Sequence, residues 1–407
     1  MTVLSALFRR DATTYPITVR DFNPPNLAAE VVLTGGDGPA VPRVVSEKMG
    51  KTVALPVEIL LSEASQGDLR DEVDALNSFL RGGTCTFEVT FQDAAAATIY
   101  DVYYADPLTP PYSRSANLMH WVKGTLNLYV SPFSRTASAN LYTAQVVATP
   151  NSLALSGLAG IYRTPLTHTI ASQTADDLHS AYLALAPAAM TSYLFEAESL
   201  TWGAGAATLT DATAHGGSAK KIASVTAVAA TMDVAALEET EYRLIARVKV
   251  LGGETGTIYC DVTQNRGLPD VTFTRSSWHI VELGECTLPA VKVRSGVSPL
   301  VVSVKSTSAT AGHEACVDWV IALPTRRGIW SWHHTTDASD CDTIHHDADD
   351  GVTYVDDVAD GRYVTGNTLM AYSSEYLLVV TENAAGDAAS QNAEVTIAAP
   401  GRYPWMR

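Results

Sequence analysis

The sequence predicts a mainly β protein with several domains. The chain has 407 residues, a length that favours two to four domains. Hydrophobic residues make up 46% of the chain and charged residues only 17%, while small residues such as Ala and Gly are abundant. Short apolar-alternating segments recur between turns. We therefore expect an N-terminal α+β domain (antiparallel sheet plus one helix), a β-sandwich and a small C-terminal β extension.

Residues 1–135 are predicted to form the α+β domain. In KTVALPVEILLSE, alternate residues from Val53 to Leu61 are apolar, which is the pattern of a strand buried on one face. The next segment, SQGDLRDEVDALNSFLRGG, has apolar residues at helical spacing, Asp68 as a candidate N-cap and two closing glycines. Further strands are predicted for TCTFEVTF, TIYDVYY and GTLNLYVS. This order predicts one helix packed on an antiparallel sheet.

The rest of the chain is predicted as three further regions. Residues 136–192 are rich in Ala, Ser and Thr, and we expect a linker with one short helix, ADDLHSAYLALAP, capped by Thr174. Residues 193–326 hold strands such as YRLIARVKVL and ACVDWVIAL, separated by Gly-containing turns at the spacing of a sandwich. Residues 327–407 hold short strands that predict a smaller β extension.

Charge and cysteine content exclude several classes of protein. The net charge of −17 opposes direct binding to nucleic acid, which needs clustered Lys and Arg. No segment is long and apolar enough to span a bilayer, and the arginines of MTVLSALFRRD follow too short an apolar run for a signal peptide. The cysteines are odd in number and form no CxxC pair, so we expect free buried thiols made in a reducing cytoplasm.

No recognisable catalytic motif is present. The sequence contains no GxSxG elbow, no HExxH pair and no phosphate loop, so we expect no enzyme activity. Residues 333–350 are rich in His and Asp, but their spacing matches neither a zinc site nor a calcium loop. A solvated polar loop is the favoured interpretation of this segment.

Two carboxylates stand out in the segment LFEAES, where Glu196 and Glu198 lie two residues apart. In a strand such residues point to the same side, and two like charges repel unless water, a cation or a base faces them. The basic candidates in the sequence are Lys220, Lys221 and Arg247. Solvation or pairing with one of these bases is one interpretation, and a bound cation is the other.

The segments FEAES, AHGGSAKKI, TEYRLIARVKV and ACVDWVIALP together resemble the strand order of carbohydrate-binding jelly rolls, as in galectins and carbohydrate-binding modules. The resemblance implies a structural calcium held by Glu196, Glu198 and Asp318, because the first and last strands of such folds lie close together. It also makes Trp202 and Trp278 candidates for stacking on a glycan, although large aromatic residues in a sandwich are more often part of the core.

The N-terminal segment from PRVVSEKMGKTVALPVEILLSE to TCTFEVTF, followed by YDVYYADP and WVKGTLNLYVSPF, is similar to the belt domain of distal tail proteins. These proteins, like related minor tail proteins, belong to long-tailed (siphovirus-type) bacteriophages. The closing AEVTIAAPGRYPW is similar to the last strand of many minor tail proteins. The order of parts along the chain carries the resemblance more than any single motif.

The resemblance implies a structural virion protein of the tail tip, made in the host cytoplasm. Its copies, usually six, would form a ring where the tail tube protein meets the tip, with the tip (hub) and tape-measure proteins as neighbours. Jelly rolls would project outward to contact host-surface glycan or to anchor other tip proteins. No cofactor is required beyond the calcium that the fold family implies. The alternatives are a free carbohydrate-binding protein without ring assembly and a glycan-cleaving tail enzyme.

Overall fold

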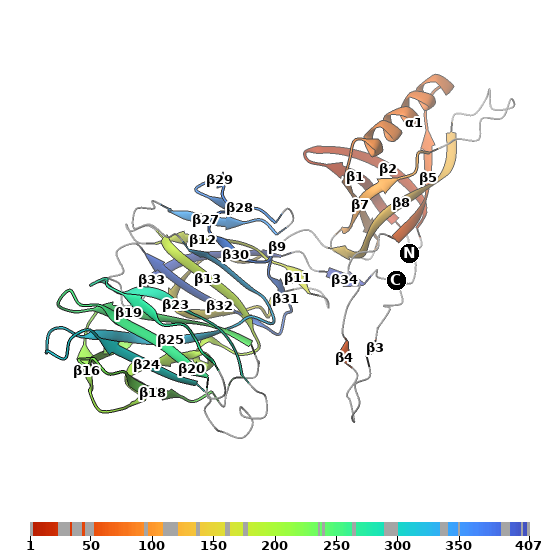
Figure 1. Cartoon of the computed structure of the whole chain (residues 1–407). Helices are drawn as coiled ribbons and strands as arrows, with labels where there is room; N and C mark the ends of the chain where they lie inside the picture. Colours follow the sequence, from red (N-terminus) through yellow and green to blue (C-terminus); the bar gives the residue numbers. More distant parts are fainter. Residues whose placement is uncertain are drawn as a thin grey trace. The chain divides into compact units, whose positions relative to one another are not determined.

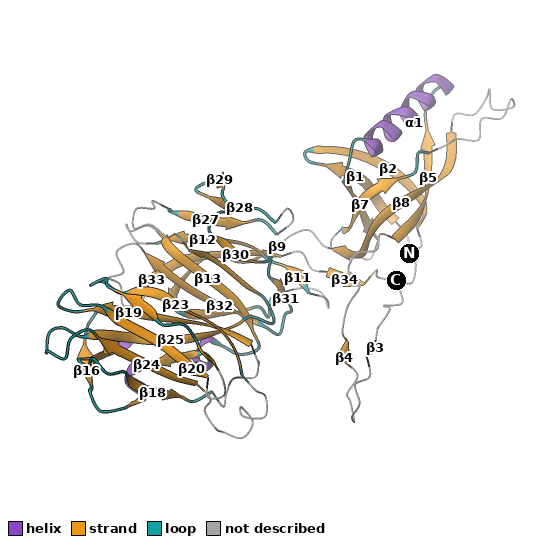
Figure 2. Ribbon diagram, viewed as in Figure 1, coloured by secondary structure: helices purple, strands orange, loops and turns teal. Residues whose placement is uncertain are grey.

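The structure is a computed structural model, and it confirms a mainly β fold (Figures 1 and 2). It describes residues 3–22, 33–34, 43–44, 53–92, 97–108, 121–135, 139–158, 163–173, 178–234, 237, 241–262, 266–288, 300–333, 341–348, 351–383, 391–399 and 402–404. Figure 2 shows the α-helix α1 and, apart from short 3₁₀ helices, strands joined by loops.

The chain divides into two compact units, and the second is inserted in the first. The first unit comprises Met1–Ala139, Ala159–Tyr162 and Pro400–Arg407, so both ends of the chain belong to it. The second unit comprises Asn140–Leu158 and Arg163–Ala399.

The first unit is a closed antiparallel barrel, which we call the barrel. Its described strands follow the order β8-β5-β2-β1-β6-β7, and β7 pairs with β8 to close the cylinder, while β34 adds to the far end of β8. The strands are β1 (Val3–Arg10), β2 (Thr13–Phe22), β5 (Val53–Ser62), β6 (Cys85–Phe91), β7 (Thr98–Ala105), β8 (Trp121–Arg135) and β34 (Arg402–Pro404); β3 (Leu33–Thr34) pairs with β4 (Arg43–Val44). The predicted inward face of β5, from Leu55 to Leu61, is buried as expected.

Helix α1 (Gln66–Arg81) lies between β5 and β6 and buries an apolar stripe that ends at Leu80. Its N-cap is Ser65 and not the predicted Asp68, because the Ser65 hydroxyl accepts the Asp68 amide hydrogen at 3.2 Å. At the other end, the Gly82 amide donates to the Phe79 carbonyl, and the Arg10 guanidinium donates to the carbonyls of Phe79, Gly83 and Thr84.

The second unit begins and ends with a β-sandwich that we call the host sandwich. One of its sheets has the order β10-β32-β13-β26-β30, and the other has the order β29-β28-β27-β12-β33-β9. Its strands are β9 (Ala139–Thr149), β10 (Asn151–Ala154), β11 (Thr164–Pro165), β12 (Thr167–Ser172), β13 (Leu178–Ala186), β26 (Ile329–His333), β27 (Thr343–His346), β28 (Thr353–Val355), β29 (Val358–Ala359), β30 (Val364–Gly366), β31 (Met370–Ala371), β32 (Tyr376–Asn383) and β33 (Gln391–Ala399).

The host sandwich corrects two predictions for the regions 136–192 and 327–407. The short helix after Thr174 is wrong: Leu178–Ala186 is strand β13, with every residue buried, and Thr174 itself lies outside the described residues. Nor are the two regions a linker and a separate extension, because β12 pairs with β27 and β33, and β13 pairs with β26 and β32. Part of the extension, β34, joins the barrel instead.

Between β13 and β26 the chain forms a second sandwich, which we call the inserted sandwich. Its first strand, β14, pairs with its last, β25, as the jelly-roll resemblance implies. One sheet has the order β16-β17-β25-β19-β23 and the other β15-β18-β24-β20-β21, with β22 paired to β20. The strands are β14 (Leu194–Glu196), β15 (Thr201–Trp202), β16 (Ala206–Thr210), β17 (Ser218–Ile222), β18 (Val228–Met232), β19 (Glu241–Val250), β20 (Gly256–Val262), β21 (Arg266–Gly267), β22 (Val271–Phe273), β23 (His279–Thr287), β24 (Leu300–Ser306) and β25 (Ala315–Pro324).

The two sandwiches of the second unit stack into four sheet layers. Alternate residues of β13 point to different cores: Leu183 and Leu185 pack with the β12 sheet, whereas Tyr182 and Ala184 pack with the inserted sandwich. The β25 sheet is likewise covered on one side by the β13 sheet and on the other by the β24 sheet. The central strands of the two middle layers, β13 and β25, therefore have no solvent face, and every one of their residues is buried.

Candidate functional site

The three residues predicted to hold calcium lie at the start and end of the inserted sandwich. Glu196 is the last residue of β14, and Asp318 lies on the neighbouring strand β25. Glu198 is not on the strand, because the chain turns into a short 3₁₀ helix, Ala197–Ser199. The alternation expected of LFEAES therefore stops at Glu196.

Glu196 and Glu198 nevertheless approach the same loop. A β-carbon at Gly216 would stand 3.4 Å from Glu198 Oε1 and 4.0 Å from Glu196 Oε1. Glu196 Oε1 also lies 3.1 Å from His215 Nδ1. Glu198 Oε2 is buried without a hydrogen-bond partner, and burial, together with the charge of Glu196, raises the pKa of Glu198. Glu198 thus has an unpaired oxygen close to a second carboxylate.

Asp318 is held differently, by an internal cation. Its Oδ2 accepts a hydrogen bond from Arg247 Nη1 at 2.6 Å, and both of its oxygens accept the His215 amide hydrogen, at 3.1 and 3.0 Å. The aspartate is 1% exposed, and burial raises its pKa to about 6 although Arg247 opposes the shift. The other two bases predicted as partners of Glu196 and Glu198 bind different residues: Lys221 pairs with Glu314 at 3.2 Å, and Lys220 donates to Thr208.

The donor set fits the implied calcium only in part. Glu196 and Glu198 supply the negative charge and the orphaned oxygen that a hard cation would satisfy. Asp318 does not fit, because Arg247 already neutralises it. In the part of the chain that the structure describes, no three His, Cys, Asp or Glu side chains are grouped as they would be around a metal ion.

The two predicted glycan-stacking residues have different environments. Trp278 is 1% exposed: it packs with Ala214, Ala219 and Cys316, its indole donates to Thr213 Oγ1 at 3.1 Å, and Lys249 Nζ lies 4.5 Å from its ring centre. A buried ring cannot stack on a sugar, so the prediction for Trp278 is wrong.

Trp202 is half-buried, and its indole donates to the Ala197 carbonyl at 2.8 Å. It packs against the core of the inserted sandwich. The residue is partly exposed, and its role in glycan binding stays a prediction.

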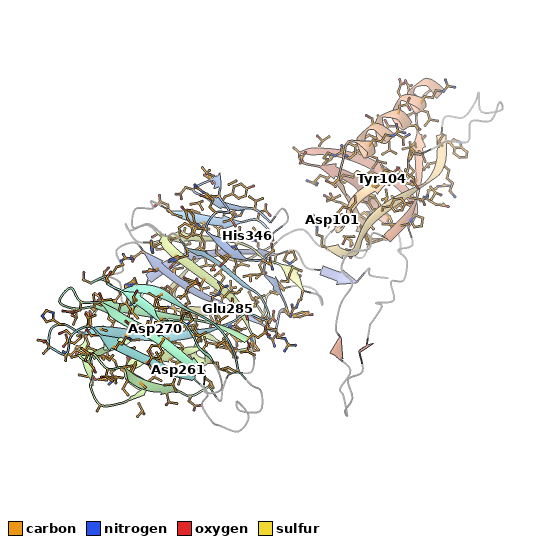
Figure 3. All side chains as sticks on the ribbon, in the orientation of Figure 1. Asp101, Tyr104, Asp261, Asp270, Glu285 and His346 are labelled. Atoms are coloured by element: carbon orange, nitrogen blue, oxygen red, sulfur yellow. The ribbon has the colours of Figure 1, made fainter. Side chains whose placement is uncertain are left out.

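The His- and Asp-rich segment is only partly described. His334 to Asp340, Asp349 and Asp350 lie outside the described residues. Cys341 and His346 are buried, and His346 (labelled in Figure 3) accepts or donates hydrogen bonds with Thr353 at 3.0 Å and Thr368 at 3.1 Å. These two residues belong to the core of the host sandwich, contrary to the expectation of a solvated loop.

No sequence pattern indicates the buried histidine that lies next to His346. His168 on β12 stacks on His346 with ring centres 5.2 Å apart and meets Trp330 edge-on at 4.6 Å. Burial and the proximity of His346 lower the pKa of His168 to about 3. This histidine is therefore held neutral inside the host sandwich.

The barrel carries most of the large apolar side chains that are exposed among the described residues. They are Leu4 (70% exposed), Tyr103 (54%), Tyr104 (57%) and Trp121 (51%), against Val225 and Val358 in the second unit. Leu4 and Tyr103 each lie at a register shift in strand pairing, and such bulges re-aim side chains. Tyr104, labelled in Figure 3, lies 5.6 Å from Tyr129, measured between ring centres. Sequence pattern alone did not single out these residues.

The expectation of free buried thiols is confirmed, since all five cysteines are free and buried. Burial raises the pKa values of Cys286 and Cys316 to about 12, which keeps both thiols protonated. Within the described segments, no helix is long and apolar enough to cross a membrane.

Comparisons with known proteins complete the description. No protein-family model matches the sequence, and the search of curated proteins found no match. Among solved structures, the phage p2 baseplate in its activated conformation with Sr is similar over 97% of this chain and 97% of that chain, at 9% identity and a TM-score of 0.29. A carbohydrate-binding module, TmCBM61, solved with β-1,4-galactotriose, covers 32% of this chain and 90% of its own length, at 12% identity and a TM-score of 0.24.

The Agl-KA catalytic domain is similar over 33% of this chain, at 13% identity and a TM-score of 0.25, and the chain spans only 28% of that protein. Structures of a phage baseplate and of a carbohydrate-binding module are thus both among those to which the chain is similar. At these identities and TM-scores, none of the likenesses carries an argument about function.

Proposed function

We propose that the chain is a structural protein of a bacteriophage tail tip, a distal-tail-like subunit whose barrel assembles into a ring, usually of six copies. The proposal starts from the sequence resemblance of the barrel segments and of the closing strand to tail proteins. The observation that carries it is the set of exposed aromatic and apolar side chains on the barrel. Tyr and Trp are enriched where proteins associate, and repeated head-to-tail contacts close a ring when the rotation per copy divides a circle.

The inserted sandwich is proposed to act outside the ring, by contacting a host-surface glycan or by anchoring other tip proteins. Its buried core is shared with the host sandwich, so the two sandwiches would move as one rigid attachment. The tail tube, hub and tape-measure proteins are the proposed neighbours of the ring. No catalytic activity is proposed, because the sequence contains no recognisable catalytic motif.

The test is the size of the purified full-length chain, measured by mass photometry and negative-stain imaging. Rings or ring-prone assemblies are expected. Replacing Tyr103 and Tyr104 together by Ser should abolish them, because the exposed rings would no longer be buried between copies. Val225→Ser is the matched control, since Val225 is 60% exposed but belongs to the second unit.

Monomers at high concentration would favour the rival, a free carbohydrate-binding protein. Equal assembly by the double variant and the control would reject the barrel surface as the contact. A glycan-cleaving enzyme would release reducing ends from host envelope polysaccharide, and none are expected here.

A further inference from the structure

One carboxyl group joins the two sandwiches of the second unit. Glu382 on β32 is 2% exposed and lies where the β13 sheet covers the inserted sandwich. Ser180 Oγ, on the neighbouring strand β13, donates to Glu382 Oε2 at 3.1 Å. The Ile280 amide, on β23, donates to Glu382 Oε1 at 3.1 Å. The same side chain therefore holds one strand of each sandwich.

The Ile280 contact satisfies a backbone group that strand pairing leaves open. In the described sheet order, β23 is the last strand and pairs only with β19. Its outward amide groups need partners, because a buried amide without a hydrogen bond is destabilising. Glu382 supplies that partner at Ile280, so the carboxyl group acts as a clasp between the sheets.

The charges around Glu382 come from several elements. Arg275 precedes β23, Arg247 lies on β19, and both favour the ionised carboxylate. Arg247 is already engaged by Asp318 at 2.6 Å. The Tyr182 phenol on β13 also interacts with Glu382 and with Glu282 on β23. The hydrogen bonds from Ile280 and Ser180 also favour the ionised form, but burial outweighs them and the two arginines and raises the pKa of Glu382 to about 7.

We propose that Glu382 is a proton-dependent clasp that holds the inserted sandwich on the host sandwich. In the neutral form, the protonated oxygen can donate to Ser180 while the other oxygen accepts the Ile280 amide hydrogen. On ionisation the proton leaves to solvent, and a negative charge remains in a largely apolar layer between sheets. Such a charge is costly to bury, so the ionised clasp loosens and the junction opens to water. This inference is independent of the ring.

The direction of the pH dependence follows from proton linkage. Between about pH 4.3, the ordinary pKa of a glutamate in the unfolded chain, and about pH 7, Glu382 keeps its proton in the folded state but loses it on unfolding. The contribution of Glu382 to the free energy of unfolding is fully present below that pH range and is lost as pH rises through about 7. The clasp is therefore tight in mild acid and weak in mild alkali.

The experiment is denaturant unfolding of the full-length chain from pH 5 to 8.5, for the wild type and Glu382→Gln. Glutamine keeps an oxygen for the Ile280 amide but carries no proton to lose. Over the lower part of this pH range, the slope of the unfolding free energy with pH should show that the wild type takes up about one more proton on folding than this variant does. Glu285→Gln is the control, because Glu285 (Figure 3) is also on β23 but its side chain is 62% exposed. A pH slope that Glu382→Gln leaves unchanged overturns the proposal.

A second measurement uses the wild type alone and does not depend on how the variant folds. Carbon-13 labelling of glutamate side chains allows the titration of Glu382 to be followed by NMR, assigned by comparison with Glu382→Asp. A midpoint near 7, with faster hydrogen exchange of the Ile280 amide above it after correction for intrinsic rates, supports the clasp. A midpoint near the ordinary value of about 4.3 rejects it.

Discussion

The barrel and the second unit place their charged groups differently. In the barrel, ion pairs such as Arg9 with Glu88 and Lys123 with Glu58 lie on the outer surface, and the Arg9 and Lys123 side chains are 48% and 46% exposed. In the second unit, Arg247 and Asp318 form a pair whose side chains are 7% and 0% exposed. A barrel with one core has an outer face for every strand, whereas the central strands of the four-layer stack, β13 and β25, have none.

This difference has a consequence for stability. Charged groups on a middle layer must be satisfied internally, by an opposite charge or by a proton. On the middle layers Asp318 uses a guanidinium and Glu382 a raised pKa, while His168, on the outer β12 sheet but buried against Trp330, uses a lowered pKa. We therefore expect the stability of the second unit to depend more strongly than that of the barrel on the loss of a single charged side chain and on pH.

The largest expected effect is that of Arg247→Met. Removing the guanidinium leaves Asp318 buried without its cation, and breaking such a pair destabilises a protein by about 3–5 kcal/mol. Arg9→Met, the surface counterpart in the barrel, should lose no more than about 1 kcal/mol. Denaturant unfolding of both variants of the full chain, followed by circular dichroism, gives the comparison.

Two refinements make this test specific. The loss in Arg247→Met should shrink in acid, because Asp318 can then take up a proton, and the double variant with Asp318→Leu should recover much of it. Equal losses for the buried and the surface arginine would contradict the contrast between the two units.

The next effect is an acid response of the host sandwich. The pKa of His168 is lowered to about 3, so its contribution is fully present above the ordinary value of about 6.5 and is lost as pH falls below it. At pH 5 this amounts to about 2 kcal/mol. His168→Phe should lose this acid sensitivity, and His345→Gln, a change at a half-buried histidine bonded to Thr169, should keep it.

Buried acids with raised pKa values stabilise the fold as pH falls, which is opposite to the effect of His168. Subtracting the pH profile of His168→Phe from that of the wild type therefore isolates the contribution of His168. Residues 1–139 contain a single histidine, His120, so the barrel has far fewer groups that could give such an acid response than the second unit has. Identical pH profiles for wild type and His168→Phe, measured by melting scans, would reject a neutral buried histidine.

The same contrast explains which parts of the fold could be predicted from sequence. Strand β5 and helix α1 each bury one face, so alternation and helical spacing identify them. Strand β13 is buried on both faces, so its sequence does not alternate and does not distinguish a buried strand from a helix. The pairing of β12 with β33, which sets Ile170 against Val395, joins segments too distant in sequence for local pattern to reveal.

For the candidate site, the chemistry was easier to predict than the contacts. The jelly-roll resemblance implies that Glu196, Glu198 and Asp318 lie together, with Arg247 as one candidate base for the glutamates; β14 does pair with β25, but Arg247 pairs with Asp318. The partners could not be predicted, because a 3₁₀ turn at Glu198 and the loop at His215 decide which oxygen meets which donor.

The smallest expected effect concerns the calcium that the fold resemblance implies. Of the three implied ligands, only Glu196 and Glu198 are not already paired with Arg247, so we expect weak calcium binding. Bound calcium would stabilise the fold by about 1.4 kcal/mol when its concentration is ten times its dissociation constant. A melting scan with calcium should therefore give a slightly higher midpoint than a scan with chelator. Glu198→Gln should remove the difference and should itself be tolerated, because it relieves the repulsion between the two carboxylates. An unchanged wild-type midpoint would mean that His215 and solvent suffice for the pair, so that no site in the inserted sandwich would need a metal to hold its charges.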